Sequence, residues 1–272
     1  MTDLFPFALP GEFNPFGPTP PKKTWGVNFG GGVNSSALLL TLRDRGLRPH
    51  WVVFADTGSE RPETYENVVR VEAWSKKVGF PFDTTNWTRV KGERAGEFQP
   101  LHEACLATSY LPSKAYGKAG CTYKWKIQPM ERWRKANGFT PTYIAIGYDA
   151  GEKQRLKNAK AALCGDYDLN ADETPWYPLI GFDMNRKACE KRLAQEGWPV
   201  VKSACFMCPN MRPPEWEALK VEHPDLYAIA VKIQDTAKAA GNAETVNLFR
   251  AYDPNNATCV CTADGCLTKE DP

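Results

Sequence analysis

Short apolar runs alternate with longer amphipathic segments over the first third of the chain. The runs Trp25–Phe29, His50–Asp56 and FPFDTTNW (80–87) predict three strands. Between them, Ser36–Arg45 and Glu63–Lys77 have the apolar faces of helices, and Gly46 ends the first. This strand–helix order favours a parallel sheet with right-handed crossovers.

After residue 87 the regular alternation of strands and helices ends, and most of the expected elements are helical or irregular. Residues 88–120 are expected to be irregular, Thr142–Asp149 predicts a fourth strand, and Pro129 must stand near a helix start or a kink. The remaining expected segments are a partly helical stretch (Thr122–Gly138), a polar loop or short helix (152–163), an extended run (175–182) and helices at Asn185–Gly197, Pro214–Glu222 and Pro224–Ala240. We therefore expect an α/β fold: an open parallel sheet of about five strands with helices on both faces, plus a C-terminal helical segment.

These segments predict a linear domain organisation. Residues 1–24, rich in Pro, Gly and Phe, are expected to form an extended arm, because they lack the basic and apolar regions of a signal peptide. Residues 25–180 would form the nucleotide-binding domain, 181–252 a helical segment packed on it, and 253–272 a polar, cysteine-rich tail. A cytoplasmic location is the default expectation.

Composition narrows the class of protein only slightly. The 272 residues are 42% hydrophobic and 24% charged, as in an ordinary globular protein. The net charge of +2 does not by itself predict nucleic-acid binding. No apolar stretch approaches the roughly 20 residues that cross a membrane, so no membrane partner is expected.

The chain has nine cysteines, which is many for a protein of a reducing compartment. Such a set indicates metal, cluster or redox chemistry more than disulfides, and the odd count argues against a fully paired framework. The CxxC pair Cys205 and Cys208 permits either a redox pair or half of a metal site.

The stretch VNFGGGVNSSALLL (27–40) joins the first strand to the first helix. Backbone N–H groups from Gly31 to Ser36 can point at an anion there, and Ser35 and Ser36 can add hydroxyl donors. The stretch fits neither GxGxxG nor the lysine-containing P-loop. A tight turn that serves only packing is the alternative.

FGGGVNSSALLL resembles the SGGxDS loop of the PP-loop ATP pyrophosphatases, and more closely the SGGVQST loop of the phosphoadenosine phosphosulfate (PAPS) reductase family and its bacterial and phage relatives. The resemblance implies an adenine nucleotide alpha-hydrolase-like fold that binds ATP or PAPS. The phosphate-binding residues implied are Gly30, Gly31, Gly32, Val33, Asn34, Ser35 and Ser36. Gly30 stands where the first Ser is usual, and Asn34 where Asp is common. Asn34 cannot hold Mg²⁺ with a charge, so the departure bears on ATP hydrolysis more than on phosphate binding.

Two further stretches resemble the same family. FADTGSERPET (54–64) is similar to its DTG…PET segment, which implies that Asp56, Thr57 and Glu63 contact the nucleoside; alternatively Asp56 caps a turn. IAIGYDAGEKQR (144–155) is similar to a second signature. There the resemblance implies close backbone approach at Gly147, a phosphate or sulfate contact from Arg155, and a Glu152 that orients Arg155 or contacts Mg²⁺. A solvated helix start is the alternative.

GCTYKWKIQPMERW (120–133) resembles the CT..yKi.Pi stretch of the family, so Lys124 and Lys126 are candidate anion contacts that could neutralise a leaving pyrophosphate. Taken singly, such lysines are ordinary surface residues. The residues expected to act in catalysis are Asn34, Lys124 and Arg155.

The resemblance also implies a metal site. Phage-type relatives have a similar cysteine arrangement, which adds Cys121 and Cys189 to Cys205 and Cys208. Four thiolates suit a [4Fe–4S] cluster, which we favour, or Zn²⁺. For Cys189, on an expected helix, an inert buried thiol is the alternative. The tail segment DGCL (264–267) resembles only faintly the ECGLH segment of the reductases, and a disordered tail is the preferred interpretation.

Three functions remain open. In the first, a substrate oxygen is adenylated by ATP, pyrophosphate leaves, and sulfur from a donor displaces AMP; the acceptor is a nucleic acid or a small molecule. In the second, a cysteine attacks the sulfur of PAPS or adenylyl sulfate, and a thiol reductant releases sulfite; the weak tail motif disfavours it. In the third, favoured by Asn34, the protein binds nucleotide or nucleic acid without turnover and contains structural zinc. A homodimer is compatible with all three.

Overall fold

The computed structural model describes residues 13–89, 91–112, 120–152, 155–157, 172–199, 202–242, 248–249, 259–262 and 265–268, the last two ranges as backbone only. The chain forms two compact units that interleave along the sequence. Unit 1 takes its described residues from Met1–Ala55, Pro62–Thr85 and Pro129–Ser203. Unit 2 takes them from Asp56–Arg61, Asn86–Gln128 and Ala204–Pro272. The units therefore cut across the linear division expected from the sequence.

A five-stranded sheet with the order β3-β2-β1-β4-β5 forms the centre of unit 1. Its strands are β1 (Trp25–Phe29), β2 (Val52–Asp56), β3 (Phe82–Asn86), β4 (Thr142–Ala145) and β5 (Glu173–Trp176). β1 pairs in parallel with β2, Val27 opposite Val52, and with β4, Val27 opposite Ala145. β4 in turn pairs in parallel with β5. The parallel α/β sheet expected from the sequence is confirmed.

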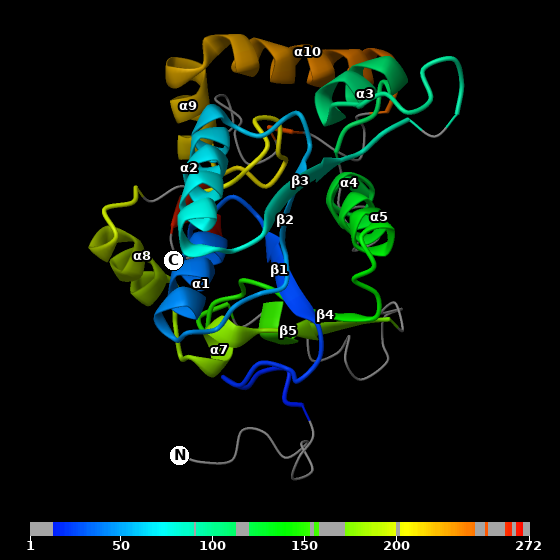
Figure 1. Ribbon diagram of the computed structural model, residues 1–272. Coiled ribbons are helices and arrows are strands. Elements are labelled where there is room, and N and C mark those ends of the chain that lie inside the picture. The colour runs from blue at the N-terminus through cyan, green and yellow to red at the C-terminus, as the bar shows by residue number, and fades with distance from the viewer. Residues whose placement is uncertain are drawn as a thin grey trace. The chain divides into compact units, whose positions relative to one another are not determined.

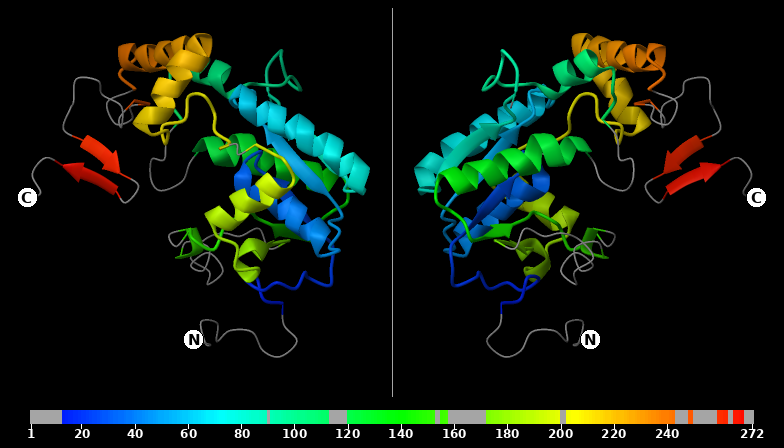
Figure 2. Two further views of the ribbon diagram at one scale, coloured as in Figure 1. Left: turned by 90° about the vertical axis from the view of Figure 1, so that its left-hand side faces the viewer. Right: turned by 90° about the vertical axis from the view of Figure 1, so that its right-hand side faces the viewer.

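Helices cover both faces of this sheet, as expected. They are α1 (Val33–Asp44), α2 (Pro62–Val78), α5 (Gln128–Ala136), α7 (Pro178–Gly181) and α8 (Arg186–Gln195). Alternate residues of β2 point to opposite faces: Val52 and Phe54 pack with α1 and α2, whereas Val53 packs with Met130 of α5. Figure 1 shows α1 and α2 on one side of the sheet and α5 on the other, and Figure 2 shows the two faces in turn.

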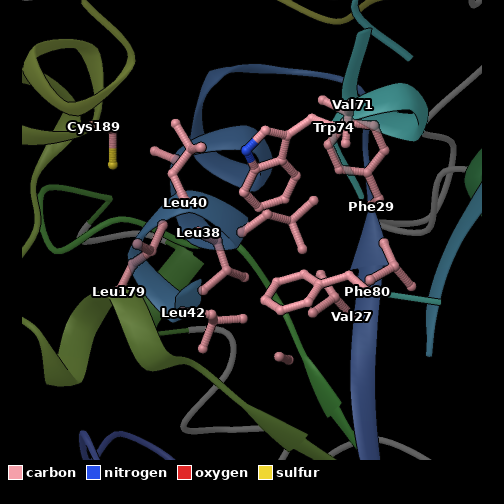
Figure 3. Packing of buried hydrophobic residues seen from close by; sticks show 14 of the residues in the cluster. Val27, Phe29, Leu38, Leu40, Leu42, Val71, Trp74, Phe80, Leu179 and Cys189 are labelled. Carbon is pink, nitrogen blue, oxygen red and sulfur yellow. The ribbon is translucent and has the colours of Figure 1, made fainter. Parts of the chain in front are cut away.

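The core on the α1 face is built around the leucines of that helix. Leu38, Leu40 and Leu42 are fully buried between the sheet and the residues of α2 and α7. Figure 3 shows them lying between Trp74 and Leu179. The near-continuous apolar run ALLLTL accounts for a helix that is buried on most of its circumference.

Unit 2 is mainly helical. Its elements are α3 (Leu101–Thr108), α4 (Gly120–Thr122), the π-helix η2 (Tyr123–Ile127), α9 (Pro213–Glu222), α10 (Pro224–Ala239) and a hairpin of β6 (Cys259–Thr262) and β7 (Gly265–Thr268). α10 packs on both α3 and α9. The π turn ends at Ile127, two residues before Pro129, whose missing N–H and bulky ring disfavour a regular α turn there. Pro129 is the second residue of α5, so it lies near a helix start, one of the two positions expected for it.

Three local expectations differ from the structure. α3 lies within the region expected to be irregular; it has Pro100 before it and ends at Ser109, whose φ is 55°. α7 interrupts the run expected to be extended, with Pro178 at its start. Part of the expected tail forms the β6–β7 hairpin. Residues 1–12 of the expected arm and most of the polar run 152–163 lie outside the described residues.

No helix in the described part of the chain combines the length and apolar character needed to span a membrane.

Candidate functional site

The glycine loop leaves the carboxyl end of β1 and begins α1 in unit 1. Gly31 has a φ of +75°, which favours glycine, and Gly32 is the N-cap residue with no side chain to cap the helix. The first-turn N–H groups of an α-helix have no intrahelical acceptor, and the first turn of α1 contains no acidic residue. The loop therefore has the backbone donors and the positive helix end that an anion requires.

The side chain of Asn67 in α2 makes two hydrogen bonds to the loop. Its Nδ2 donates to the Gly31 carbonyl at 2.8 Å and to the Ser36 Oγ at 3.0 Å. The Ser35 hydroxyl donates to the Gly32 carbonyl at 3.1 Å. The Ser35 hydroxyl, expected to donate to a phosphate, thus donates within the loop instead, whereas the Ser36 oxygen accepts from Asn67 and its own proton remains available.

Asn34, in the first turn of α1, connects the loop to the segment after β4. Its Nδ2 donates to Asp149 Oδ2 at 2.8 Å and to Glu152 Oε2 at 3.4 Å, while its Oδ1 accepts from Arg186 at 3.4 Å. Asp149 is 4% exposed and also accepts from the Gly151 N–H at 2.8 Å. Asn34 itself carries no charge, but the carboxylates of Asp149 and Glu152 lie directly beside it.

Two close approaches fix the shape of this site. A Cβ on Gly147 would lie 3.1 Å from the Ser35 backbone nitrogen, so this segment packs directly on the loop backbone; its expected approach to a nucleotide stays a prediction. A Cβ on Gly32 would lie 2.6 Å from the Ser203 Oγ. The end of unit 1 at Ser203 thus borders the amino end of α1.

The strand order places this loop at a topological switch point. β2 and β3 continue from β1 in one direction and β4 and β5 in the other. In open parallel sheets, ligands bind beyond the carboxyl ends of the strands where the order reverses. The loops after β1 and β4 meet at this position, since Gly147 contacts Ser35.

Arg155 lies close to Glu152, as expected. Its Nη1 is 2.8 Å from Glu152 Oε1, and its guanidinium stands 5.2 Å from the centre of the Tyr148 ring. The side chain is 59% exposed, so it can reach an anion in solvent.

Asp56 and Thr57 belong to unit 2. Asp56 Oδ1 accepts from the Gly58 N–H at 2.7 Å, which is the turn-capping arrangement considered as the alternative. Thr57 Oγ1 is 3.2 Å from Glu60 Oε1 and 3.5 Å from the Cys205 sulfur. In this structure Thr57 contacts the residues around a cysteine; its expected contact with a nucleoside stays a prediction.

Lys124 also lies in unit 2. Its Nζ stands 4.4 Å from the centre of the Trp125 ring and 5.2 Å from that of Trp87. Burial lowers the pKa of Lys124, and the charge of Arg89 lowers it further. Its expected contact with a leaving pyrophosphate stays a prediction.

A buried ion pair adjoins Cys205 in unit 2. Lys126 Nζ is 2.7 Å from Glu60 Oε1, and the Cys205 sulfur is 3.6 Å from the same oxygen. The Glu60 side chain is fully buried, whereas that of Lys126 is 31% exposed. Burial alone would lower the pKa of Lys126, but the charges of Glu60 and Cys205 outweigh it and raise that pKa.

The CxxC residues form a tight turn, in which the Cys208 N–H donates to the Cys205 carbonyl at 3.1 Å. Burial raises the pKa of the Cys205 thiol well above its ordinary value, Glu60 raises it further, and Lys126 opposes the change. Burial also raises the pKa of Cys121, with a contribution from Cys208. Cys121, Cys205 and Cys208 are all partly buried against one hydrophobic cluster of unit 2.

Cys189 differs from the other three expected ligands. It is completely buried in the hydrophobic core of unit 1, where Figure 3 shows it on the Leu40 side of the cluster. Burial raises its pKa to about 12, with further contributions from Asp149, Glu152 and Glu190. These surroundings agree with the inert thiol that the sequence left as an alternative.

The donor set of unit 2 fits a thiolate-bound group. Within the described residues, no three cysteine sulfurs lie within 4.8 Å of one another. A single zinc ion draws its thiolates to about 2.3 Å from one centre, whereas each thiolate of an iron–sulfur cluster binds a different iron. A cluster therefore accommodates thiols that are spaced more widely than those around one zinc ion.

Several residues of these sites were not predicted from the sequence. Asp149 lies in the segment IAIGYDAGEKQR and Glu60 in FADTGSERPET. Both segments were identified from the sequence, but the residues that Asp149 and Glu60 contact could not be. Asn67 lies in a helix and has no motif around it; only the structure identifies its hydrogen-bond partners.

Comparison with known proteins gives limited information. No protein-family model matches the chain. The uncharacterized protein MJ0066 of Methanocaldococcus jannaschii is 26% identical over 223 residues, which is 76% of this chain. The chain spans about two fifths (40%) of the length of that relative. Among solved structures, the U34-tRNA thiolase NcsA from Methanococcus maripaludis with its [4Fe-4S] cluster is 11% identical, with a TM-score of 0.42, over 80% of this chain and 72% of that one.

Proposed function

We propose that the protein is an adenine-nucleotide-binding enzyme that splits ATP between its α and β phosphates and uses the activated product for sulfur transfer. The observation that carries this proposal is the open amino end of α1, preceded by Gly31 and Gly32, at the switch point of a parallel sheet. Such an end binds phosphates through backbone N–H groups and needs no lysine.

The chemistry follows from what surrounds the loop. A substrate oxygen attacks the α-phosphorus, the bond to the bridging oxygen of the β-phosphate breaks, and pyrophosphate leaves with the bonding electrons. Asp149 and Glu152 supply negative charge that can hold the Mg²⁺ of the nucleotide, the function that Asn34 itself lacks. The exposed guanidinium of Arg155 is available to the departing phosphates.

The thiols of unit 2 provide the second part of the proposal. Cys121, Cys205 and Cys208 would bind a [4Fe–4S] cluster, which would supply a site where a sulfur donor can be held. Lys126, beside Cys205, would offset the negative charge of the thiolates. The adenylated acceptor, a nucleic acid or a small molecule, then loses AMP to the incoming sulfur.

The test is product analysis after incubation with ATP and Mg²⁺. We expect AMP and pyrophosphate, whereas ADP with phosphate would contradict cleavage at the α-phosphorus. Sulfite release from PAPS in the presence of a thiol would instead support the reductase. Nucleotide binding without any product would support the non-catalytic alternative.

A further inference from the structure

Besides Cys121, Cys205 and Cys208, the structure describes the side chain of Cys105 in unit 2, which the sequence did not connect with the others. Cys105 stands in the middle of α3 and is 6% exposed. It belongs to the same hydrophobic cluster against which Cys121, Cys205 and Cys208 pack. The four cysteine side chains that the structure describes in unit 2 therefore all belong to, or pack against, one hydrophobic cluster.

Cys105 has both a thiol and an ammonium group among its neighbours. The Cys121 thiol is near enough to contribute to its electrostatics, and Cys121 interacts in the same way with Cys208. Burial raises the pKa of Cys105 to about 12, as it does that of Cys189, and the positive charge of Lys124 opposes this change. Cys105, Cys121, Cys208 and Cys205 thus form a continuous series of interacting thiols.

The charges around Cys189 have the opposite sign. Asp149, Glu152 and Glu190 would all repel a thiolate at that position, and only Arg186 opposes them. Among the cysteines whose side chains the structure describes, none is a main contributor to the pKa of Cys189. Its acidic neighbours and its place in the core of unit 1 therefore make Cys189 a poorer candidate ligand than Cys105.

We propose that Cys105, and not Cys189, is the fourth thiol of the metal site formed with Cys121, Cys205 and Cys208. This inference rests on the thiolate-bound group of the proposed function. Each ligand thiol releases its proton to solvent when the group binds.

The experiment compares Cys105→Ala with Cys189→Ala, a matched control because both residues are buried core thiols on helices. Each protein is purified without oxygen and assayed for iron, sulfide and zinc per chain, with circular dichroism to verify folding. We expect Cys189→Ala to retain the wild-type content and Cys105→Ala to lose at least half of it. Full content in Cys105→Ala, or loss only in Cys189→Ala, would overturn the assignment.

If Cys105→Ala does not fold, the wild-type protein decides. Oxidation with ferricyanide releases iron from a cluster with three thiolates, because one iron lacks a cysteine, and produces the paramagnetic [3Fe–4S] form. We expect no such signal from the wild type or from Cys189→Ala; its appearance would overturn a four-thiol site. A chain with neither iron nor zinc would do the same.

The outcome for Cys105 can be distinguished from the outcome for the proposed function. Zinc in place of iron and sulfide, lost only from Cys105→Ala, would support Cys105 while contradicting the cluster. Pyrophosphate release from ATP depends on the loop of unit 1 and is measured independently of metal content.

Discussion

Asn34 Nδ2 donates a hydrogen bond of 2.8 Å to Asp149 Oδ2, across 115 residues of sequence. The amide thereby joins the first turn of α1 to the segment that follows β4. It is oriented by charge on both sides, since its oxygen accepts from Arg186 while its nitrogen faces Asp149 and Glu152. An uncharged residue at this position is therefore suited to two adjacent carboxylates.

The first prediction concerns this amide. Asn34→Asp has the same shape, but it replaces a donor with a third carboxylate facing Asp149 and Glu152. We expect it to be less stable than Asn34→Ala by about 1 kcal/mol, since it adds repulsion to the loss of the donor. Thermal unfolding in metal-free buffer measures this difference. Equal stability of the two variants would show that the carboxylates do not act on position 34.

The second prediction tests the loop as a binding site. A Cβ at Gly32 would lie 2.6 Å from the Ser203 Oγ, whereas the nearest atom to one at Gly30, its two chain neighbours aside, would be the Ser35 Oγ at 3.9 Å. Gly32 has a φ of −111°, which alanine tolerates, so Gly32→Ala should shift the loop without straining the backbone. We expect Gly32→Ala to weaken ATP binding at least tenfold in calorimetry.

Gly30→Ala is the matched control and should bind ATP within a factor of about three of the wild type. Equal loss of affinity in both variants would indicate general damage to the loop, and unchanged affinity in both would indicate that the nucleotide binds elsewhere.

The arrangement of the sheet could be predicted from the sequence because its signals are local. β1 has the expected bounds, and α10 begins at the expected proline, since an apolar run and a fixed φ act within a few residues. α3 was missed because its eight residues are short for a periodic pattern and are bounded by Pro100 and Ser109 without a polar cap.

The candidate site was only partly predictable for a different reason. The loop Gly30–Ser36 is a contiguous motif, whereas the bond from Asn34 to Asp149 depends on which strands become neighbours. The grouping of cysteines likewise depends on how the two units interleave, which places Cys189 in one unit and Cys105 in the other. Resemblance to a motif shows how the cysteines are spaced along the chain, but it does not show in which hydrophobic core each of them lies.

The third prediction concerns the buried ion pair of unit 2. Lys126→Met would leave the carboxylate of Glu60, whose side chain is fully buried, without its 2.7 Å partner. Removal of one partner from a buried pair costs about 3 kcal/mol or more, because the remaining charge stays desolvated. Urea unfolding should register a loss of this size.

The double variant Glu60→Gln with Lys126→Met is the informative control. Without the carboxylate there is no buried charge to compensate, so we expect the double variant to recover at least half of the lost stability. A double variant as unstable as the sum of the single changes would show that Glu60 and Lys126 act independently.

The fourth prediction concerns two surface ion pairs that connect the C-terminal ends of α1 and α8. Arg43 lies 2.9 Å from Glu196, and Arg192 lies 2.6 Å from Asp44. Burial would raise the pKa of Asp44, but the hydrogen bonds from Arg192 and Arg43 outweigh it and lower that pKa. A hydrogen bond from Arg43 lowers the pKa of Glu196. Both carboxylates therefore stabilise the folded state in their ionised form.

Because these folded-state pKa values lie below the unfolded ones, the stabilisation is present above the unfolded values of about 4 and is lost as pH falls through the folded values.

Arg192→Gln should cost less than about 1 kcal/mol at pH 7, since the Asp44 side chain is 40% exposed and solvent screens the pair. The cost should disappear once the pH has fallen below the lowered folded-state pKa values, where both carboxyls are protonated in either state. Lys191→Gln, at an exposed position of the same helix, should have no such pH dependence in urea titrations. A cost for Arg192→Gln that persists at low pH would assign the effect to packing of the arginine stem and not to its charge.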